Sequence, residues 1–519
     1  MIEFYINFHS GGMFMMKKIW SIICVFAVIM LLIAGCGNEN RSAQVFNPSS
    51  PAVKNINLIK PAQESSTKID FLKNQYKLDV KLDTKLKTLT GKEKLIYVNK
   101  SKVPLKEVYF HVYPNAYKER STTPSQFGFN QTFPEGFSAG SIDIKDVCTN
   151  GKPSDFEISG KDKTILRIPL EKELKPGKKV DLSLDFIVKI PKGKDRLSYY
   201  DTSYNFGNWY PIAAEYDNKG WHLDSYYSMG DPFYSTVSNY KVDVTVPKDY
   251  IVASTGEAGK EKIKNNLKTY SFSEENVRDF AFTTSNKFKV KEEKVDGINI
   301  KCYGLGTDSE LSYEMNYAKN SIKTFNKFFG KYPYKTYSVA ESSFLTGMEY
   351  PGIVFISNDP SYKKSGYYES IVVHETAHQW WYGVIGDDEV NEAWLDESFA
   401  CYSENIYNES VKSSRVDFLR LKDYYNIYSK ANPDKNVILK PVQDFKDDIE
   451  YSTLVYYKGA VMLDDLREKI GDEEFFKIIQ TYYSRYKYRI TTTEDFIGVV
   501  NEITGENWNN YFNKWLKGQ

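Results

Sequence analysis

Cysteine is scarce in this 519-residue sequence, and neither sign of charge is in excess. Only 5 Cys are present, and those beyond the N-terminal region, Cys148, Cys302 and Cys401, show no pairing pattern and no metal-ligand spacing. The sequence therefore lacks a disulfide framework, and its stability has to come from hydrophobic cores. We assign these cysteines no role.

The balance of charge argues against a nucleic-acid-binding protein. Lys and Arg total 68, as do Asp and Glu, so the formal net charge is zero. A nucleic-acid partner would require a basic surplus gathered on one face, and we predict none. With 41% hydrophobic and 26% charged residues the composition is that of a soluble globular protein, and the length is sufficient for two or three domains.

The N-terminal segment has the composition of an export signal. Lys17 and Lys18 precede an apolar run over residues 19–34, which is too short for a comfortable membrane span but typical of a secretory signal peptide. The run ends in Ile33-Ala34-Gly35-Cys36, which resembles the bacterial lipobox. We therefore predict a lipoprotein signal peptide over residues 1–36 and acylation of Cys36. The acyl chains would hold the protein on the extracytoplasmic face of a bacterial cell membrane.

Two changes of pattern divide the rest of the chain. Residues 37–68 are rich in Asn, Ser, Pro and Lys without hydrophobic periodicity, which predicts a flexible tether. Over residues 69–288 apolar and polar residues alternate, as at Val180, Leu182 and Leu184, and turn signals separate the runs. This alternation predicts a large antiparallel β domain, a saddle or sandwich in which each sheet buries one face.

The period becomes helical after about residue 300. Apolar residues then recur at spacings of four and three from Leu311 to Phe329, which draws one stripe along a helix. Thr307 and Glu310 have the spacing of a capping box at its start. Further helices are expected near 455–470, 472–486 and 493–504. We predict an α+β chain in which a mainly helical domain at 289–519 follows the β domain.

The helical part contains the motif His374-Glu375-Thr376-Ala377-His378. On a helix, positions i and i+4 share a face, so both imidazoles can reach one ion, with Glu375 beside them. Zinc in hydrolytic sites takes three protein ligands and lowers the pKa of a water molecule to about 7. Chance is a poor explanation, because two of only 5 His fall in this pattern. The apolar flanks predict a buried helix that continues through Tyr382 and stops at Gly383.

The third ligand decides the subtype of the metal site. The metzincin extension needs Gly and His at positions that hold Trp381 and Val384. Glu397 follows His378 by nineteen positions, which leaves room for a loop and an antiparallel helix. We predict Glu397 as the third ligand and Glu392 as the alternative.

The combined motif resembles the aminopeptidase N family of gluzincins. In that family HExxH is followed, after eighteen residues, by the Glu of W-L-x-E-x-F-A, and residues 394–400 read W-L-D-E-S-F-A. The resemblance implies a β saddle domain followed by a thermolysin-like catalytic domain. It also implies one Zn²⁺ ion held by His374, His378 and Glu397, with Glu375 as general base and acid.

A second segment carries the resemblance to an exopeptidase. Gly347-Met348-Glu349-Tyr350 resembles the G-x-M-E-N segment, whose Glu binds the free α-amine of the substrate. By match, Glu349 is that carboxylate, and Gly347 and Met348 belong to the same substrate-binding strand. Thr346 and Tyr350 depart from the family pattern. The family has a second amine-binding residue in the β domain, and no residue of this sequence matches it. We expect residues 208–231 to occupy the corresponding part of the domain.

Two further residues follow from the resemblance. Tyr456 begins Tyr456-Tyr457-Lys458-Gly459, which resembles the family's Y-x-K-G segment, and its phenol would stabilise the oxyanion. Glu404, seven residues beyond Glu397, matches a carboxylate that orients a zinc ligand.

The sequence thus predicts a zinc aminopeptidase that acts on peptides with a free N-terminus. Two alternatives remain open: an endopeptidase or dipeptidase with the same zinc chemistry, and a surface binding protein without turnover. The preferred side chain and the oligomeric state do not follow from the sequence.

Overall fold

The structure of the protein is a computed structural model that describes residues 72–231, 233–433 and 436–518. The predicted signal peptide, the predicted acylation site Cys36 and the whole of the predicted tether lie outside the described residues. Within the described ranges, no helix is both long and apolar enough to cross a membrane.

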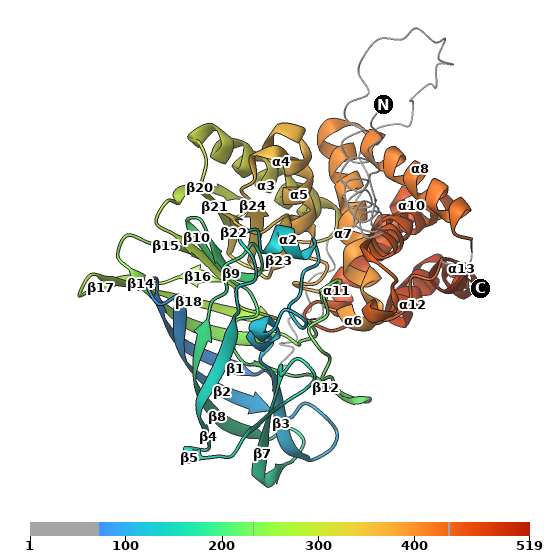
Figure 1. Cartoon of the computed structure of the whole chain (residues 1–519). Helices are drawn as coiled ribbons and strands as arrows, with labels where there is room; N and C mark the ends of the chain where they lie inside the picture. Colours follow the sequence, from blue (N-terminus) through green and yellow to red (C-terminus); the bar gives the residue numbers. More distant parts are fainter. Residues whose placement is uncertain (1–71, 232, 434–435, 519) are drawn as a thin grey trace, which may run out of the picture. The chain divides into compact units, whose positions relative to one another are not determined.

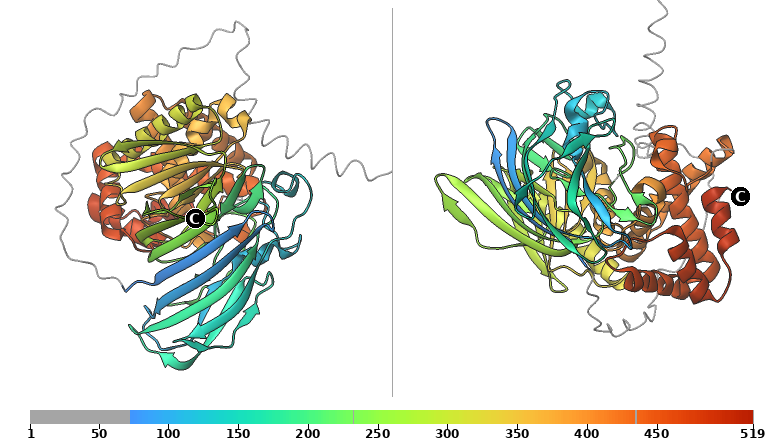
Figure 2. Two further views of the ribbon diagram at one scale, coloured as in Figure 1. Left: turned by 90° about the vertical axis from the view of Figure 1, so that its left-hand side faces the viewer. Right: turned by 90° about the horizontal axis from the view of Figure 1, so that it is seen from below.

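The β half is built on one large twisted sheet (Figures 1 and 2). Its strands follow the order β16-β18-β14-β1-β2-β8-β4-β5, with β17 paired to β18. In β1 every second side chain, from Tyr76 to Leu82, is buried, as the alternating pattern predicts. The strands are β1 (Gln75–Asp83), β2 (Thr88–Val98), β4 (Ser141–Thr149), β5 (Lys152–Pro153), β8 (Lys179–Lys189), β14 (Ser238–Pro247), β16 (Glu257–Ala258), β17 (Lys262–Lys264) and β18 (Leu267–Val277).

The prediction of an antiparallel β domain is wrong for one pair of strands. β1 and β14 run parallel, in a register from Gln75 opposite Asn239 to Lys81 opposite Thr245. A parallel pair needs a long crossover, and the many residues between these strands provide one that local alternation does not reveal. The other strand pairs of this sheet are antiparallel. The large sheet is therefore mixed.

Smaller sheets and short helices complete the β half. One sheet has the order β15-β19-β10-β9, a second has the order β11-β3-β7-β6, and β12 pairs with β13. Their bounds are β3 (Leu105–His111), β6 (Glu157–Ser159), β7 (Ile165–Leu174), β9 (Leu197–Tyr200), β10 (Ser203–Phe206), β11 (Ile212–Ala213), β12 (Tyr216–Asp217), β13 (Gly220–Trp221), β15 (Ile251–Ser254) and β19 (Phe282–Ser285), with helices η1 (Tyr113–Lys118) and α2 (Phe129–Thr132).

The second half opens with another mixed sheet, of order β20-β21-β22-β24-β23. β21, β22 and β24 are parallel, and β20 and β23 pair with their neighbours in antiparallel fashion. β23 is an edge strand, so one side of its backbone is not used by the sheet. The bounds are β20 (Lys289–Val295), β21 (Ile298–Gly304), β22 (Thr336–Ser342), β23 (Gly347–Tyr350) and β24 (Ile353–Ser357).

Helices make up the rest of this half (Figure 1). The long helix α3 begins at the predicted capping box of Thr307 and Glu310, and the predicted helices 472–486 and 493–504 are confirmed as α11 and α12. The bounds are α3 (Asp308–Phe328), α4 (Pro360–Ser365), α5 (Tyr367–Ala377), α6 (Glu389–Glu392), α7 (Trp394–Tyr407), η2 (Asn408–Lys412), α8 (Val416–Ala431), η3 (Val442–Asp444), α9 (Asp448–Tyr451), η4 (Ser452–Lys458), α10 (Gly459–Ile470), α11 (Asp472–Tyr486), α12 (Thr493–Thr504) and α13 (Asn509–Lys517).

The helix that carries the HExxH motif ends earlier than predicted. α5 stops at Ala377 with His378 as its C-cap, and Tyr382 has a left-handed φ of 103°. The Nδ1 atom of His378 lies 3.0 Å from the carbonyl oxygen of Trp381, which a continuing helix would point away from the imidazole. The turn after His378 therefore fixes the orientation of this ring.

Candidate active site

Helices α5 and α7 bring three nitrogen and oxygen atoms together at one point. The Nε2 atoms of His374 and His378 lie 3.2 Å apart, and each lies 3.3 Å from Oε2 of Glu397. Ligands at roughly 2.0–2.2 Å from a tetrahedral zinc ion are about 3.3–3.6 Å from one another. The triangle therefore has the dimensions of three zinc ligands.

The other ring nitrogens are already in use. Nδ1 of His374 lies 3.0 Å from Oε1 of Glu404, and Nδ1 of His378 donates to the carbonyl of Trp381. With the hydrogens on Nδ1, both Nε2 lone pairs point into the triangle, which is the tautomer that a metal requires. The donor set and its geometry fit a zinc ion.

The structure separates the two acidic candidates for the third ligand. Oε2 of Glu392 accepts hydrogen bonds from N and Oγ1 of Thr493, at 2.7 and 2.6 Å, at the start of α12. Glu392 thus ties α6 to α12, whereas Glu397 lies at the triangle.

Glu375 is buried beside the triangle. Its Oε2 accepts no hydrogen bond from the described chain, and burial raises the pKa of its carboxyl to about 8. Gly347 of β23 makes room for it, because a Cβ atom at this position would lie 2.6 Å from Cδ of Glu375. A glycine on the neighbouring strand is therefore a condition for the position of Glu375.

Tyr456 closes another side of the site. Its hydroxyl donates to Oε1 of Glu397 at 2.5 Å, and its ring stacks on His374 with the centroids 5.9 Å apart. Burial raises the pKa of this phenol well above its ordinary value, so Tyr456 keeps its hydrogen. It lies in the π-helical segment η4, and such segments are frequent at functional sites.

Two further carboxylates, those of Glu349 and Asp231, face the triangle. Ligand atoms of Glu349, Asp231 and Glu397 lie within 4.8 Å of one another, and Glu349 and Asp231 are only 5% and 7% exposed. Burial and the nearby Asp231 raise the pKa of Glu349 well above its ordinary value. Two buried carboxylates this close favour a cation between them.

Asp231 was not identified from the sequence. It comes from an irregular segment of the β half, where no period marks a buried side chain. It forms an ion pair with Arg196, which is also buried. The available signal was this lone arginine in an aromatic stretch, since a buried arginine needs a carboxylate partner.

Strand β23 separates its residues by face. Because side chains alternate along a strand, Gly347 and Glu349 share one face, and Met348 and Tyr350 share the other. Met348 and Tyr350 belong to one buried hydrophobic cluster. The structure thus places Met348 in a core and not beside Glu349. Tyr350, which replaces the expected Asn, reaches the β half, where its hydroxyl lies 3.3 Å from Oδ1 of Asn208.

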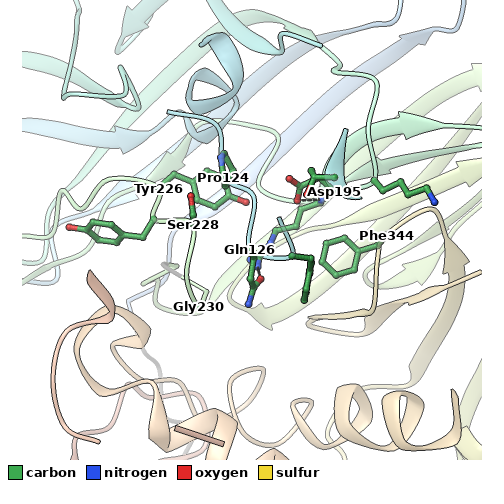
Figure 3. A pocket seen from close by; sticks show the side chains of 12 residues that line it. Pro124, Gln126, Asp195, Tyr226, Ser228, Gly230 and Phe344 are labelled. Atoms are coloured by element: carbon green, nitrogen blue, oxygen red, sulfur yellow. Dashed lines mark hydrogen bonds between the residues drawn. The ribbon is translucent and has the colours of Figure 1, made fainter. Parts of the chain in front are cut away.

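Arg196 also lines a small pocket, shown in Figure 3 with Asp195, Gln126 and Phe344 labelled. Its volume of about 10 Å³ has room for about one water molecule. A pocket of this size cannot hold a peptide side chain. We therefore treat it as part of the surroundings of the Arg196–Asp231 pair.

The fold and the site together resemble those of the gluzincin class of zinc peptidases. A β half precedes a helical half, and HExxH on α5 meets a glutamate on α7. Residues 313–515 match the model of the peptidase family M1 domain.

Comparisons with known proteins point to the same class. The chain is 27% identical over 205 residues to "Aminopeptidase N" of Streptomyces lividans, covering 37% of this chain and 24% of that protein. It is 25% identical over 409 residues to "Probable aminopeptidase 2" of Sulfurisphaera tokodaii, covering 72% of this chain and 48% of that protein. It thus spans less than half the length of these relatives. The fold matches an M1 zinc metallopeptidase from Deinococcus radiodurans with a TM-score of 0.62 at 17% identity, covering 86% of this chain and 94% of that one.

These findings support a gluzincin of the aminopeptidase N family, and residues 313–515 are similar to the peptidase family M1 domain. This similarity indicates a catalytic zinc ion, which the geometry of His374, His378 and Glu397 fits.

Proposed function

We propose that this protein is a zinc aminopeptidase that removes N-terminal residues from peptides. His374, His378 and Glu397 hold the zinc ion, Glu375 is the general base and acid, and Tyr456 is the oxyanion donor. Glu349 and Asp231 bind the free amine of the substrate.

The observation that carries this proposal is the carboxylate pair of Glu349 and Asp231 beside the triangle. A protonated α-amine can pair with both, whereas an internal peptide bond offers no positive charge. Arg196 offsets the charge of Asp231, and the buried charge of Glu349 is left for the substrate amine, so the site discriminates against substrates that lack a positive charge.

The zinc ion, Glu375 and Tyr456 have separate roles in hydrolysis. When bound, zinc polarises the scissile carbonyl and makes a water molecule acidic near neutral pH. Glu375 takes the proton of the attacking water on its free Oε2 and passes it to the leaving amine. Tyr456 donates its hydroxyl hydrogen to the carbonyl oxygen as negative charge develops there.

The free edge of β23 supports a peptide as the substrate. A backbone added beside an edge strand gains main-chain hydrogen bonds. Among the solved structures with a similar fold, one is a mutant of the Deinococcus radiodurans enzyme bound to a Tyr-Ser-Ala substrate. We extend this kind of ligand, a short peptide with a free N-terminus, to the present chain.

The variant Glu375→Gln tests the assignment of the base. It should keep one zinc ion per chain, because Glu375 is not a ligand, and lose peptide hydrolysis by roughly a hundredfold or more. Metal content and turnover are measured on the same preparation. Full activity in the zinc-loaded variant would contradict the role of Glu375.

We also propose that the protein is a lipoprotein of the bacterial cell surface, anchored through Cys36. The support is the apolar run that ends in Ile33-Ala34-Gly35-Cys36. Metabolic labelling with a fatty acid should mark the full-length chain and fail to mark Cys36→Ala. Labelling of both would contradict acylation at this residue.

A further inference from the structure

A second acidic cluster lies in the segment that joins the two zinc-ligand helices. Ligand atoms of Asp387, Glu389 and Asp396 lie within 4.8 Å of one another. The side chains are buried, with exposed fractions of 4%, 1% and 1%. None of them belongs to the zinc triangle or to the amine site.

Four of the six carboxylate oxygens of this cluster lack a hydrogen-bond donor among the described residues. Both carboxylate oxygens of Asp387 and both of Glu389 accept no hydrogen bond from the part of the chain that the structure describes. Asp396 accepts one, from the backbone N–H of Glu397 at 2.5 Å. Buried carboxylates are normally paired with a cation or coordinate a metal, so these oxygens call for a ligand.

The arginine beside the cluster does not supply the missing donors. Arg278 packs against Gly386, where a Cβ atom would lie 2.5 Å from its Nε. Four of its five N–H groups are already used by backbone carbonyls, those of Tyr382, Ser235, Val384 and Arg489. Arg278 offsets one negative charge and leaves two charges of the three carboxylates without a partner.

We propose that Asp387, Glu389 and Asp396 bind a hard divalent cation, Ca²⁺ in particular, at a site distinct from the catalytic zinc. The donor atoms are all oxygens, which Ca²⁺ prefers and which suit zinc less well than imidazole or thiolate. Two oxygens bound to Ca²⁺ at about 2.3–2.6 Å lie at most about 5 Å apart, so the 4.8 Å limit fits one ion. Two positive charges match the charge that Arg278 leaves.

The position of the site suggests what the ion does. Asp396 directly precedes Glu397 and receives its N–H, and Asp387 and Glu389 lie at the start of the short helix that leads to α7 (Figure 1). The ion therefore holds together the connection between α5 and α7. Its role is to position Glu397, and it takes no part in the reaction itself.

Calcium binding is tested on the zinc-loaded protein. The protein is dialysed in calcium-free buffer, and the melting temperature is then measured with and without Ca²⁺. At a hundred times the Kd, Tm should rise by roughly 3 °C, and one Ca²⁺ per chain should remain after desalting. Terbium, which replaces Ca²⁺, should show luminescence sensitised by nearby aromatic rings.

The double variant Asp387→Asn, Glu389→Gln should lose the rise in Tm, the bound Ca²⁺ and the terbium signal, and keep its zinc. Glu93→Gln is the matched control, because Glu93 is a buried carboxylate of the large sheet that accepts no hydrogen bond from the described residues and belongs to none of the acidic clusters found among them. This control should respond to Ca²⁺ as the parent does. If the double variant fails to fold, the measurements on the parent decide. A parent that retains no Ca²⁺ and gives no terbium signal overturns the proposal, as does a full response in the double variant.

Discussion

The carboxylates of Asp231 and Glu349 lie within 4.8 Å of one another, although 118 positions separate them in the chain. Asp231 comes from the β half, and Glu349 comes from the edge strand of the second half. The amine site is therefore shared between the two halves. Neither half can form it alone, so the function proposed above requires both halves.

Asp231→Asn should lower kcat/KM on peptides with a free N-terminus by about tenfold to a hundredfold. The reason is the loss of one charge-assisted hydrogen bond to the substrate amine, worth about 1.5–3 kcal/mol. Steady-state kinetics on one unblocked peptide measure the effect.

Asp195→Asn is the control for that experiment. Asp195 is also buried, but its carboxylate accepts the backbone N–H of Arg196 at 2.7 Å. An unchanged kcat/KM in Asp231→Asn would contradict the amine-binding role, and so would an equal loss in both variants.

Gly347→Ala should lower kcat with little effect on zinc content. The added methyl group would overlap the carboxylate of Glu375 and displace the base from its position. Misplacement by about 1 Å costs on the order of a hundredfold in rate. Gly498→Ala is the control, because a Cβ atom there meets no atom of the described residues within 4 Å. Equal kcat values in the two variants would argue against close packing of β23 on Glu375.

Glu404→Gln should weaken zinc binding by about tenfold to a hundredfold. Glu404 lies 3.0 Å from Nδ1 of His374, and the hydroxyl of Ser370 donates to its other oxygen. Loss of the negative charge makes the imidazole a poorer ligand. Competition with a zinc chelator measures the affinity. Ser370→Ala should have a smaller effect, and an undiminished affinity in Glu404→Gln would contradict the orienting role.

Glu93 should make the protein less stable as the pH rises. Burial raises the pKa of Glu93 well above its ordinary value in the folded protein, so the folded state keeps the proton that the unfolded state releases above about pH 4.3. Stability is therefore lost as the pH rises from the unfolded pKa toward the folded pKa. Relative to the parent, Glu93→Gln should remove up to about 1.4 kcal/mol of this loss per pH unit. Parallel stability curves for the two proteins between pH 5 and pH 8 would contradict this.

Much of the site was predictable because its chemistry is local. His374, Glu375 and His378 lie within one helical turn and a half, and Glu397 and Glu404 lie two turns apart on α7. Helical periodicity fixes the faces of such residues without knowledge of the fold. The same reasoning found the capping box of α3 and the helices α11 and α12.

The rest depends on contacts between distant segments. Asp231 stands in an irregular segment and becomes meaningful only when the fold brings it to Glu349. The parallel pairing of β1 with β14 needs the path of the whole β half. The motif grouped Met348 with Glu349. Because side chains alternate along the strand, the side chain of Met348 points into a hydrophobic core instead. α5 ends at Ala377, and the hydrogen bond that His378 makes just beyond this end, to the carbonyl of Trp381, is not encoded by hydrophobicity.

The most direct test of the proposed function compares one peptide in two forms, with a free and with an acetylated N-terminus, on the zinc-loaded protein. Release of the N-terminal amino acid is measured for the first form and cleavage at any bond for the second. The account predicts sequential release from the free peptide and a loss of at least a hundredfold on the acetylated one, because acetylation removes the charge that Glu349 and Asp231 bind. Cleavage of both forms at the same internal bond and at similar rates would contradict an aminopeptidase and indicate an endopeptidase.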